Sequence, residues 1–218
     1  GSWKNDKLEL QRFTAELAPN IQASGHGHWN PSAKHGRLYI EADGSPLVVM
    51  QFSENDRFLK SYAKSFRGFG WNSQARPHSQ IDIIYNDRSS GGGLIVDGRT
   101  TLHSTSYNGV ATERAECHFL VDSANKLVII DDLQVWRLGR LATANLIWDM
   151  AADPPLLHWR ADSQIDARGL LTMINPRWHD LLDRSKVVIP SAPHISATGT
   201  IERHKPYHST VHGRIAAE

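Results

Sequence analysis

The chain has 218 residues, and its 24 lysines and arginines nearly balance 23 aspartates and glutamates, which gives a formal net charge of +1. Nucleic-acid binding depends on a basic surface, so this balance argues against a nucleic-acid partner. Cys117 is the only cysteine, which excludes an internal disulfide and a cysteine-based zinc site, and no cofactor is expected.

Alternation of apolar and polar residues predicts mainly strands. The first expected strand covers residues 7–17, where the period is two. The same period predicts the strands that follow, at 37–42, 80–85, 93–97, 116–122, 126–136 and 142–148. Glycine-containing pairs predict hairpin turns between them, at Asp43-Gly44, Asp97-Gly98, Asn108-Gly109 and around Gly91–Gly93.

Two segments break this pattern and predict helices. A helix is expected near 54–67, because Ser53 is a good N-cap and apolar residues follow at helical spacing until Gly68. A second helical insert is expected near 166–183, where Pro176 suits the first position of a further helix.

Three segments repeat one strand pattern. Residues 18–25 are A-P-N-I-Q-A-S-G, residues 192–199 are A-P-H-I-S-A-T-G, and residues 76–83 are a looser copy, R-P-H-S-Q-I-D-I. Their prolines are separated by 58 and 116 residues. A Gly-Arg pair follows each copy, at Gly36-Arg37, Gly98-Arg99 and Gly213-Arg214. Repetition of a supersecondary unit predicts a stacked β architecture rather than a chain folded around one catalytic site, so no enzymatic activity is expected.

The expected fold is therefore mainly β (α+β): a repetitive antiparallel β-hairpin sheet, curved or groove-like, with two small helical inserts. Residues 1–2 are expected to be a tag remnant, residues 3–110 a first β repeat region, and residues 111–218 a second. The first copy of the repeat is truncated at its N-terminal side, so the chain is expected to be a fragment of a longer protein.

The pattern P-x-I-x-A-x-G followed by Gly-Arg, at 19–37 and 193–214, and the segment 109–174 resemble the AsmA-like proteins of bacterial envelopes, a group that includes the AsmA, TamB and YhdP types. In that family a strand-turn-strand ladder forms a U-shaped β groove on a periplasmic body. The resemblance implies a periplasmic protein, anchored to the inner membrane by a segment absent from this chain, with a role in lipid transport or outer-membrane homeostasis. The implied partners are phospholipids or other envelope lipids, and envelope proteins.

A lipid groove of this kind requires one continuous apolar face, which a strand supplies because successive residues alternate between faces. Burying a methylene contributes about 0.8 kcal/mol, so an acyl chain gains more from such a face than from any polar site. The residues expected to line the groove are Ile21, Leu38, Ile40, Ile81, Ile83, Leu94, Val96, Val128, Ile130, Leu146, Trp148, Ile195, Val211 and Ile215. The alternative is that these residues form a closed core beneath the helices.

The segment Gly25–Trp29 contains the sharpest candidate metal motif. His26 and His28 would point to the same side of a strand, about 7 Å apart. Metal sites normally recruit a carboxylate or cysteine as well, and the adjacent glycines favour a turn. No metal is therefore expected, and His26 and His28 are the candidate ligands if one binds.

Seven tryptophans favour a different function. Exposed tryptophans on a β-sandwich stack on sugar rings, which would make the chain a secreted carbohydrate-binding or protein-interaction module. The competing explanation is that the tryptophans pack the sheet against the helices.

Overall fold

A computed structural model describes residues 1–4, 7–18, 21–43, 68–71, 77–87, 92–175, 177–186, 193–202 and 209–216. These residues form one 13-stranded antiparallel sheet and two short helices. The strands are β1 (Ser2–Lys4), β2 (Lys7–Ala18), β3 (Ile21–Asn30), β4 (His35–Asp43), β5 (Phe69–Trp71), β6 (His78–Asn86), β7 (Gly93–Tyr107), β8 (Val110–Asp122), β9 (Leu127–Arg137), β10 (Arg140–Asp149), β11 (Leu156–Ser163), β12 (His194–Glu202) and β13 (Thr210–Ala216).

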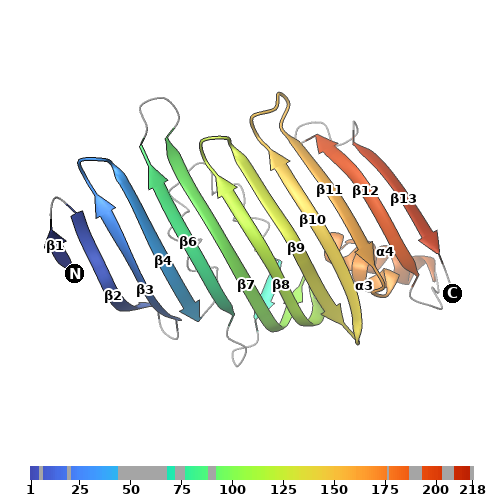
Figure 1. Ribbon diagram of the computed structural model, residues 1–218. Helices are drawn as coiled ribbons and strands as arrows, with labels where there is room; N and C mark the ends of the chain where they lie inside the picture. The colour runs from blue at the N-terminus through green and yellow to red at the C-terminus, as the bar shows by residue number, and fades with distance from the viewer. Residues whose placement is uncertain are drawn as a thin grey trace.

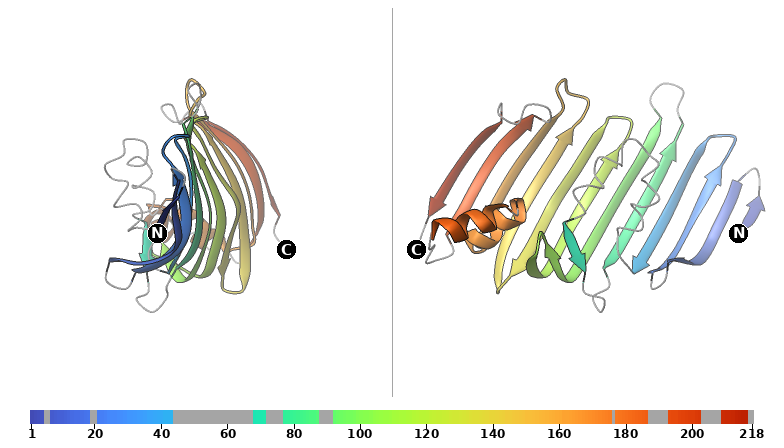
Figure 2. Two further views of the ribbon diagram at one scale, coloured as in Figure 1. Left: turned by 60° about the vertical axis from the view of Figure 1, so that its left-hand side comes forward. Right: turned by 180° about the vertical axis from the view of Figure 1, so that it is seen from behind.

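The strands lie side by side in chain order, and only β5 departs from this order by pairing with the far end of β7. Figure 1 shows the strands as a single row with the two ends of the chain at opposite ends of the sheet. Figure 2 shows that the sheet is curved and twisted rather than flat. The expected fold class, a mainly β and curved antiparallel sheet with small helical inserts, is confirmed. The helix expected near 54–67 lies outside the described residues.

All seven strands predicted from alternation are present, most of them longer than expected. The turn predicted at Asn108-Gly109 joins β7 to β8, and both residues have the positive φ angles (49° and 79°) that a two-residue hairpin turn requires. Residues 110 and 111, between which the two β repeat regions are expected to meet, both lie in β8, and the sheet continues across them. Gly44 and Gly91 lie outside the described residues, whereas Gly93 begins β7.

The hairpin turn predicted at Asp97-Gly98 is wrong, because both residues lie inside β7. The alternation of apolar and polar residues runs through this pair without interruption, so the strand does not end there. Gly98 serves a different purpose: a Cβ added to it would lie 2.4 Å from the Phe119 ring, so glycine makes room for that ring on the neighbouring strand. The same dipeptide thus marks a close approach instead of a turn.

The pairing register explains the repeated sequence pattern. In β12, Ile195, Ala197 and Gly199 alternate onto one face of the sheet, and in β3 Ala23 and Gly25 do the same. The glycines of the Gly-Arg pairs at 36, 98 and 213 lie on that face too, while their arginines point to the other. Each repeat therefore places small or apolar residues on one face and charge on the opposite face.

Helices α3 (Ala167–Ile174) and α4 (Arg177–Ser185) form at the segment predicted to be helical, and α4 continues two residues past its expected end at 183; Pro176 itself is outside the described residues. Figure 2 (right) shows both helices on one side of the sheet, over its C-terminal strands. Ser163, at the end of β11, accepts a hydrogen bond from the backbone N of Ile165 (3.1 Å) and is paired with Ile195. The helices therefore lie over the face that carries Ile195, at the Ser163 end of the strands.

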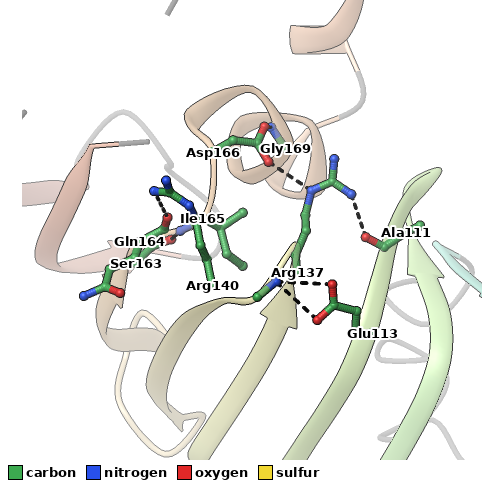
Figure 3. Close-up of polar contacts among 10 residues, drawn as sticks. Ala111, Glu113, Arg137, Arg140, Ser163, Gln164, Ile165, Asp166 and Gly169 are labelled. Atoms are coloured by element: carbon green, nitrogen blue, oxygen red, sulfur yellow. Dashed lines mark hydrogen bonds and ion pairs between the residues drawn. The ribbon is translucent and has the colours of Figure 1, made fainter. Parts of the chain in front are cut away.

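Polar contacts between Arg137 and Asp166 attach α3 to the sheet (Figure 3). Asp166 is the N-cap and accepts from the Gly169 backbone N (2.6 Å), which satisfies a donor of the first helical turn. Arg137 of β9 donates from Nε to the other Asp166 oxygen (3.0 Å) and from Nη1 to the Ala111 carbonyl of β8 (2.7 Å). One arginine thus links two strands to the helix cap, and Ile165 beside it is completely buried.

Candidate functional site

Two continuous apolar rows cross the sheet at right angles to its strands. The first apolar row takes one directly paired residue from each of eleven neighbouring strands: Phe13, Gly25, Ile40, Ile81, Gly98, Phe119, Ile130, Leu146, Trp159, Gly199 and Val211. No polar side chain interrupts it. Because neighbouring strands lie about 4.8 Å apart, its ten intervals extend over about 48 Å.

The second apolar row lies beside the first and crosses ten strands; its members are two residues from those of the first row, except on β2, where a shift in register makes the separation three. It consists of Leu10, Gly27, Leu38, Ile83, Val96, Val121, Val128, Trp148, Leu157 and Ile201. It also lacks any polar side chain. The two rows together are called the apolar track below.

The apolar track is partly accessible rather than closed. Of its members only Gly25, Ile81 and Gly98 are buried; all of the second row is half-buried, and Val211 is 63% exposed. The two helices lie toward the Ser163 end of β11, whereas Leu157 lies at the opposite end of that strand. Residues that face the interior of a sandwich are normally fully buried. The track is therefore an apolar surface without a full protein cover in the described part of the chain.

Aromatic rings lie over glycines at four places on this face. The pairs Phe13–Gly25, Trp29–Gly36, Phe119–Gly98 and Trp159–Gly199 are each directly opposite on neighbouring strands. In every case a Cβ on the glycine would lie within 3.0 Å of the ring. Glycine therefore allows each ring to lie close to the neighbouring backbone, so the rings protrude less from this face of the sheet.

The residues predicted to line a groove come together on this one face. Leu38, Ile40, Ile81, Ile83, Val96, Val128, Ile130, Leu146, Trp148 and Val211 belong to the apolar track, and the pairings of Leu94, Ile195 and Ile215 place them on the same face. Ile21 is the first residue of β3. Sequence reasoning missed five apolar side chains of the track outside β11, and all of β11: the five are Leu10, Phe13, Phe119, Val121 and Ile201. The alternation of β11 is visible in the sequence, but the run Phe119-Leu120-Val121 is apolar throughout and hides which face each residue takes.

The opposite, polar face carries ion pairs between strands. Arg37 pairs with Asp82 across β4 and β6, and Arg114 pairs with Glu116 within β8 while its guanidinium lies 5.0 Å from the centre of the Trp136 ring. The two arginine side chains are well exposed and their carboxylate partners are half-buried, so each pair contributes little stability, and this face carries the ion pairs that link or lie along these strands.

His118 on β8 contacts two carboxylates of the polar face at once. Its Nε2 lies 2.6 Å from Asp97 of β7, and its Nδ1 lies 2.5 Å from Asp131 of β9. A β-bulge at Asp131–Asp132, where Asp132 has a φ of 50°, brings Asp131 opposite the histidine. An imidazole donates through both nitrogens only when it is protonated. The hydrogen bond to Asp97, and then that to Asp131, raise the pKa of His118 above its usual 6.5, against the opposing effect of burial.

This arrangement predicts a pH-dependent contribution to stability. Because the folded pKa of His118 exceeds the unfolded value, the contribution is complete below about pH 6.5 and is lost as the pH rises through the folded pKa. We expect His118→Asn to remove on the order of 0.2–1 kcal/mol of unfolding free energy at pH 6 and less at pH 9, measured by urea unfolding. His212→Asn, at an exposed position of β13, is the control. An equal effect of His118→Asn at both pH values would contradict the prediction.

The expected turn around His26 and His28 is wrong, because both lie within β3, where the glycines face the apolar side. The His26 ring lies 5.2 Å from Tyr39, and the His28 ring 5.7 Å from His35. Burial lowers the pKa of His28, as do the nearby charge of Lys7 and that of His35. Within the described ranges, no group of three or more His, Cys, Asp or Glu side chains is arranged to hold a metal ion.

Comparisons with protein-family models, with curated proteins and with solved structures found no match for the chain. None of the helices in the described part is long and apolar enough to cross a membrane.

Proposed function

We propose that the apolar track binds the acyl chains of lipids, and that this protein is a non-enzymatic periplasmic segment acting in lipid transport or outer-membrane homeostasis. The observation that supports this most strongly is the continuity of the track, in which no polar side chain interrupts either row. The resemblance of the strand repeats to AsmA-like proteins suggests the periplasm, the anchor to the inner membrane and the envelope partners.

The dimensions of the track suit a lipid. The hydrocarbon core of a bilayer is about 30 Å thick, so an acyl chain in one leaflet spans about 15 Å. The first row extends over about 48 Å and therefore holds an acyl chain in full, with room for movement along the sheet. Each buried methylene contributes about 0.8 kcal/mol, which favours transfer from water onto the track.

The even surface of the track favours movement of a lipid along the sheet over tight binding at one position. A ligand on the track meets an apolar side chain or a glycine at each step of about 4.8 Å from strand to strand. The methylenes of an acyl chain form no hydrogen bond that could fix the chain at one position, and the ion pairs of Arg37 with Asp82 and of His118 with Asp97 and Asp131 lie on the opposite face. Movement along the row therefore exchanges equivalent apolar contacts without breaking polar ones.

Extraction of a fluorescent phospholipid from vesicles tests this function. Protein purified without detergent is mixed with phosphatidylcholine vesicles that contain self-quenched NBD-phosphatidylethanolamine, and dequenching is measured. We expect Ile83→Asp and Ile130→Asp, one on each apolar row, to lower extraction at least tenfold, because each places a charge beneath the acyl chain.

Matched controls lie one residue away. Ile84→Asp and Ile129→Asp introduce the same charge into the same strands, but on the polar face. These variants are expected to extract lipid like the wild type, with circular dichroism confirming that all four fold. Equal extraction by the track variants and their controls, or no extraction by the wild type, would overturn the proposal.

A further inference from the structure

A shallow cavity of about 410 Å³ lies at the ends of β3, β4 and β6, away from the helices. Trp29 of β3, Lys34 of the following turn, Tyr85 of β6 and Asp87 just beyond it line this cavity. The volume falls within the range of about 300–1,000 Å³ that is usual for small-molecule sites. All four side chains belong to neighbouring hairpin ends, which the backbone hydrogen bond from Asp87 N to the Lys34 carbonyl (2.9 Å) holds together.

Two aromatic rings form the apolar part of the cavity. The ring centroids of Trp29 and Tyr85 are 5.5 Å apart and the ring planes are tilted by 42°. Gly36 is paired with both residues and lies between them in the sheet. A Cβ on Gly36 would lie 2.5 Å from the Trp29 ring, so the ring rests directly on the glycine backbone. Trp29 is 36% exposed and Tyr85 39% exposed, which leaves aromatic surface open to a ligand.

An ion pair forms the polar rim. Lys34 Nζ lies 2.9 Å from Asp87 Oδ2, and both side chains remain accessible. The ammonium offers donors and the carboxylate offers acceptors, while the two charges cancel. An anionic ligand would meet Asp87 and a cationic ligand would meet Lys34, so the rim favours a neutral ligand with many hydroxyl groups.

We propose that this cavity binds the pyranose ring of a neutral saccharide, either free or as the head group of a glycolipid. The C–H face of the sugar stacks on Trp29 and Tyr85, and its hydroxyls donate to Asp87 and accept from Lys34. This site goes beyond lipid binding, because a free saccharide needs no acyl chain. It also adjoins the apolar track: Tyr85 is two residues from Ile83 of the second row, so the chain of a glycolipid can continue onto that row.

The test compares free sugars with two detergents that carry the same alkyl chain, one with a sugar head group and one without. Free maltohexaose, cellohexaose and chitohexaose are titrated by calorimetry and by tryptophan fluorescence. Dodecyl maltoside and octaethylene glycol dodecyl ether, both below their critical micelle concentrations, supply the same alkyl chain with and without a sugar. We expect at least one sugar-bearing probe to bind, and Trp29→Ala and Asp87→Asn each to weaken it about five- to tenfold.

Two further variants show whether a loss of binding comes from the missing aromatic ring at position 29 or from a general effect of removing a tryptophan. Trp29→Phe keeps an aromatic face and is expected to retain most of the binding. Trp136→Ala removes a tryptophan from the polar face and is expected to bind like the wild type.

The possible outcomes distinguish a free saccharide from a glycolipid, and they distinguish binding in this cavity from binding on the apolar track. Binding of free hexasaccharides supports a free saccharide, and binding of dodecyl maltoside alone, weakened by Trp29→Ala, supports a glycolipid. No sugar-bearing probe binding, or binding unchanged in Trp29→Ala, overturns the saccharide site. If binding of the dodecyl ether is unchanged in Trp29→Ala and abolished in Ile83→Asp, the apolar track binds alkyl chains without help from this cavity. Saccharide binding without lipid extraction would leave only this site.

Discussion

Ile165→Ala is expected to lower the free energy of unfolding by about 2–5 kcal/mol. Ile165 is the one side chain in the described residues that is large and completely buried, and it lies where β11 leads into α3. Truncation to alanine removes buried methyl groups and leaves a cavity beside the Asp166 cap and Ser163, which is itself only 3% exposed. Urea unfolding followed by circular dichroism measures the change.

Two controls define what this result means. Ile165→Val removes one methylene and is expected to cost about 0.5–1.5 kcal/mol. Leu181→Ala truncates a leucine of α4 that is 53% exposed and is expected to cost less than about 0.5 kcal/mol. If Ile165→Ala costs no more than Leu181→Ala, the helices are not fixed to the sheet in the way described.

Gly25→Ala is expected to destabilise the protein by about 1–3 kcal/mol. A Cβ at this position would lie 2.1 Å from the Tyr39 carbonyl oxygen and 2.8 Å from the Phe13 ring, so β3 must move away from β4 and the ring must be displaced. The added methyl group and the displaced ring also make the surface of the apolar track less even where β2 and β3 meet. Both unfolding free energy and lipid extraction are therefore expected to fall.

Gly213→Ala is the matched control for this substitution. Gly213 lies on the same face in β13, and its nearest neighbour would be the Ala197 Cβ at 3.2 Å, which a small adjustment relieves. Alanine also lowers the conformational entropy of the unfolded chain. This stabilises the folded state by about 0.4–1 kcal/mol and offsets the cost of that adjustment. Unfolding free energies of the two variants within about 0.5 kcal/mol of each other would contradict the account of ring-over-glycine packing.

The sequence predicts the strands well because alternation is a local property. Residues 7–17 alternate regardless of what they pair with, and β2 covers Lys7–Ala18. Asn108-Gly109 is likewise predictable, since both residues tolerate the positive φ of a tight turn. Asp97-Gly98 shows the limit of such local signals: whether a glycine turns the chain or accommodates a ring depends on Phe119, which lies on the next strand.

The apolar track and the cavity could not be predicted in the same way, because both depend on register. The bulge at Asp131–Asp132 shifts the pairing of β9 with both of its neighbours, and only that shift aligns Ile130 with Phe119 and Leu146. No local pattern marks the bulge. Trp29 and Tyr85 are far apart in the sequence, and they meet only because β4 places Gly36 between them.

The most direct test of lipid binding on the apolar track is native mass spectrometry of the protein purified without detergent, followed by organic extraction and identification of the extract. We expect bound phospholipid in the wild type and in Ile84→Asp, and its loss in Ile83→Asp. A stable, monodisperse wild-type protein that carries no lipid, and acquires none from vesicles, would contradict it.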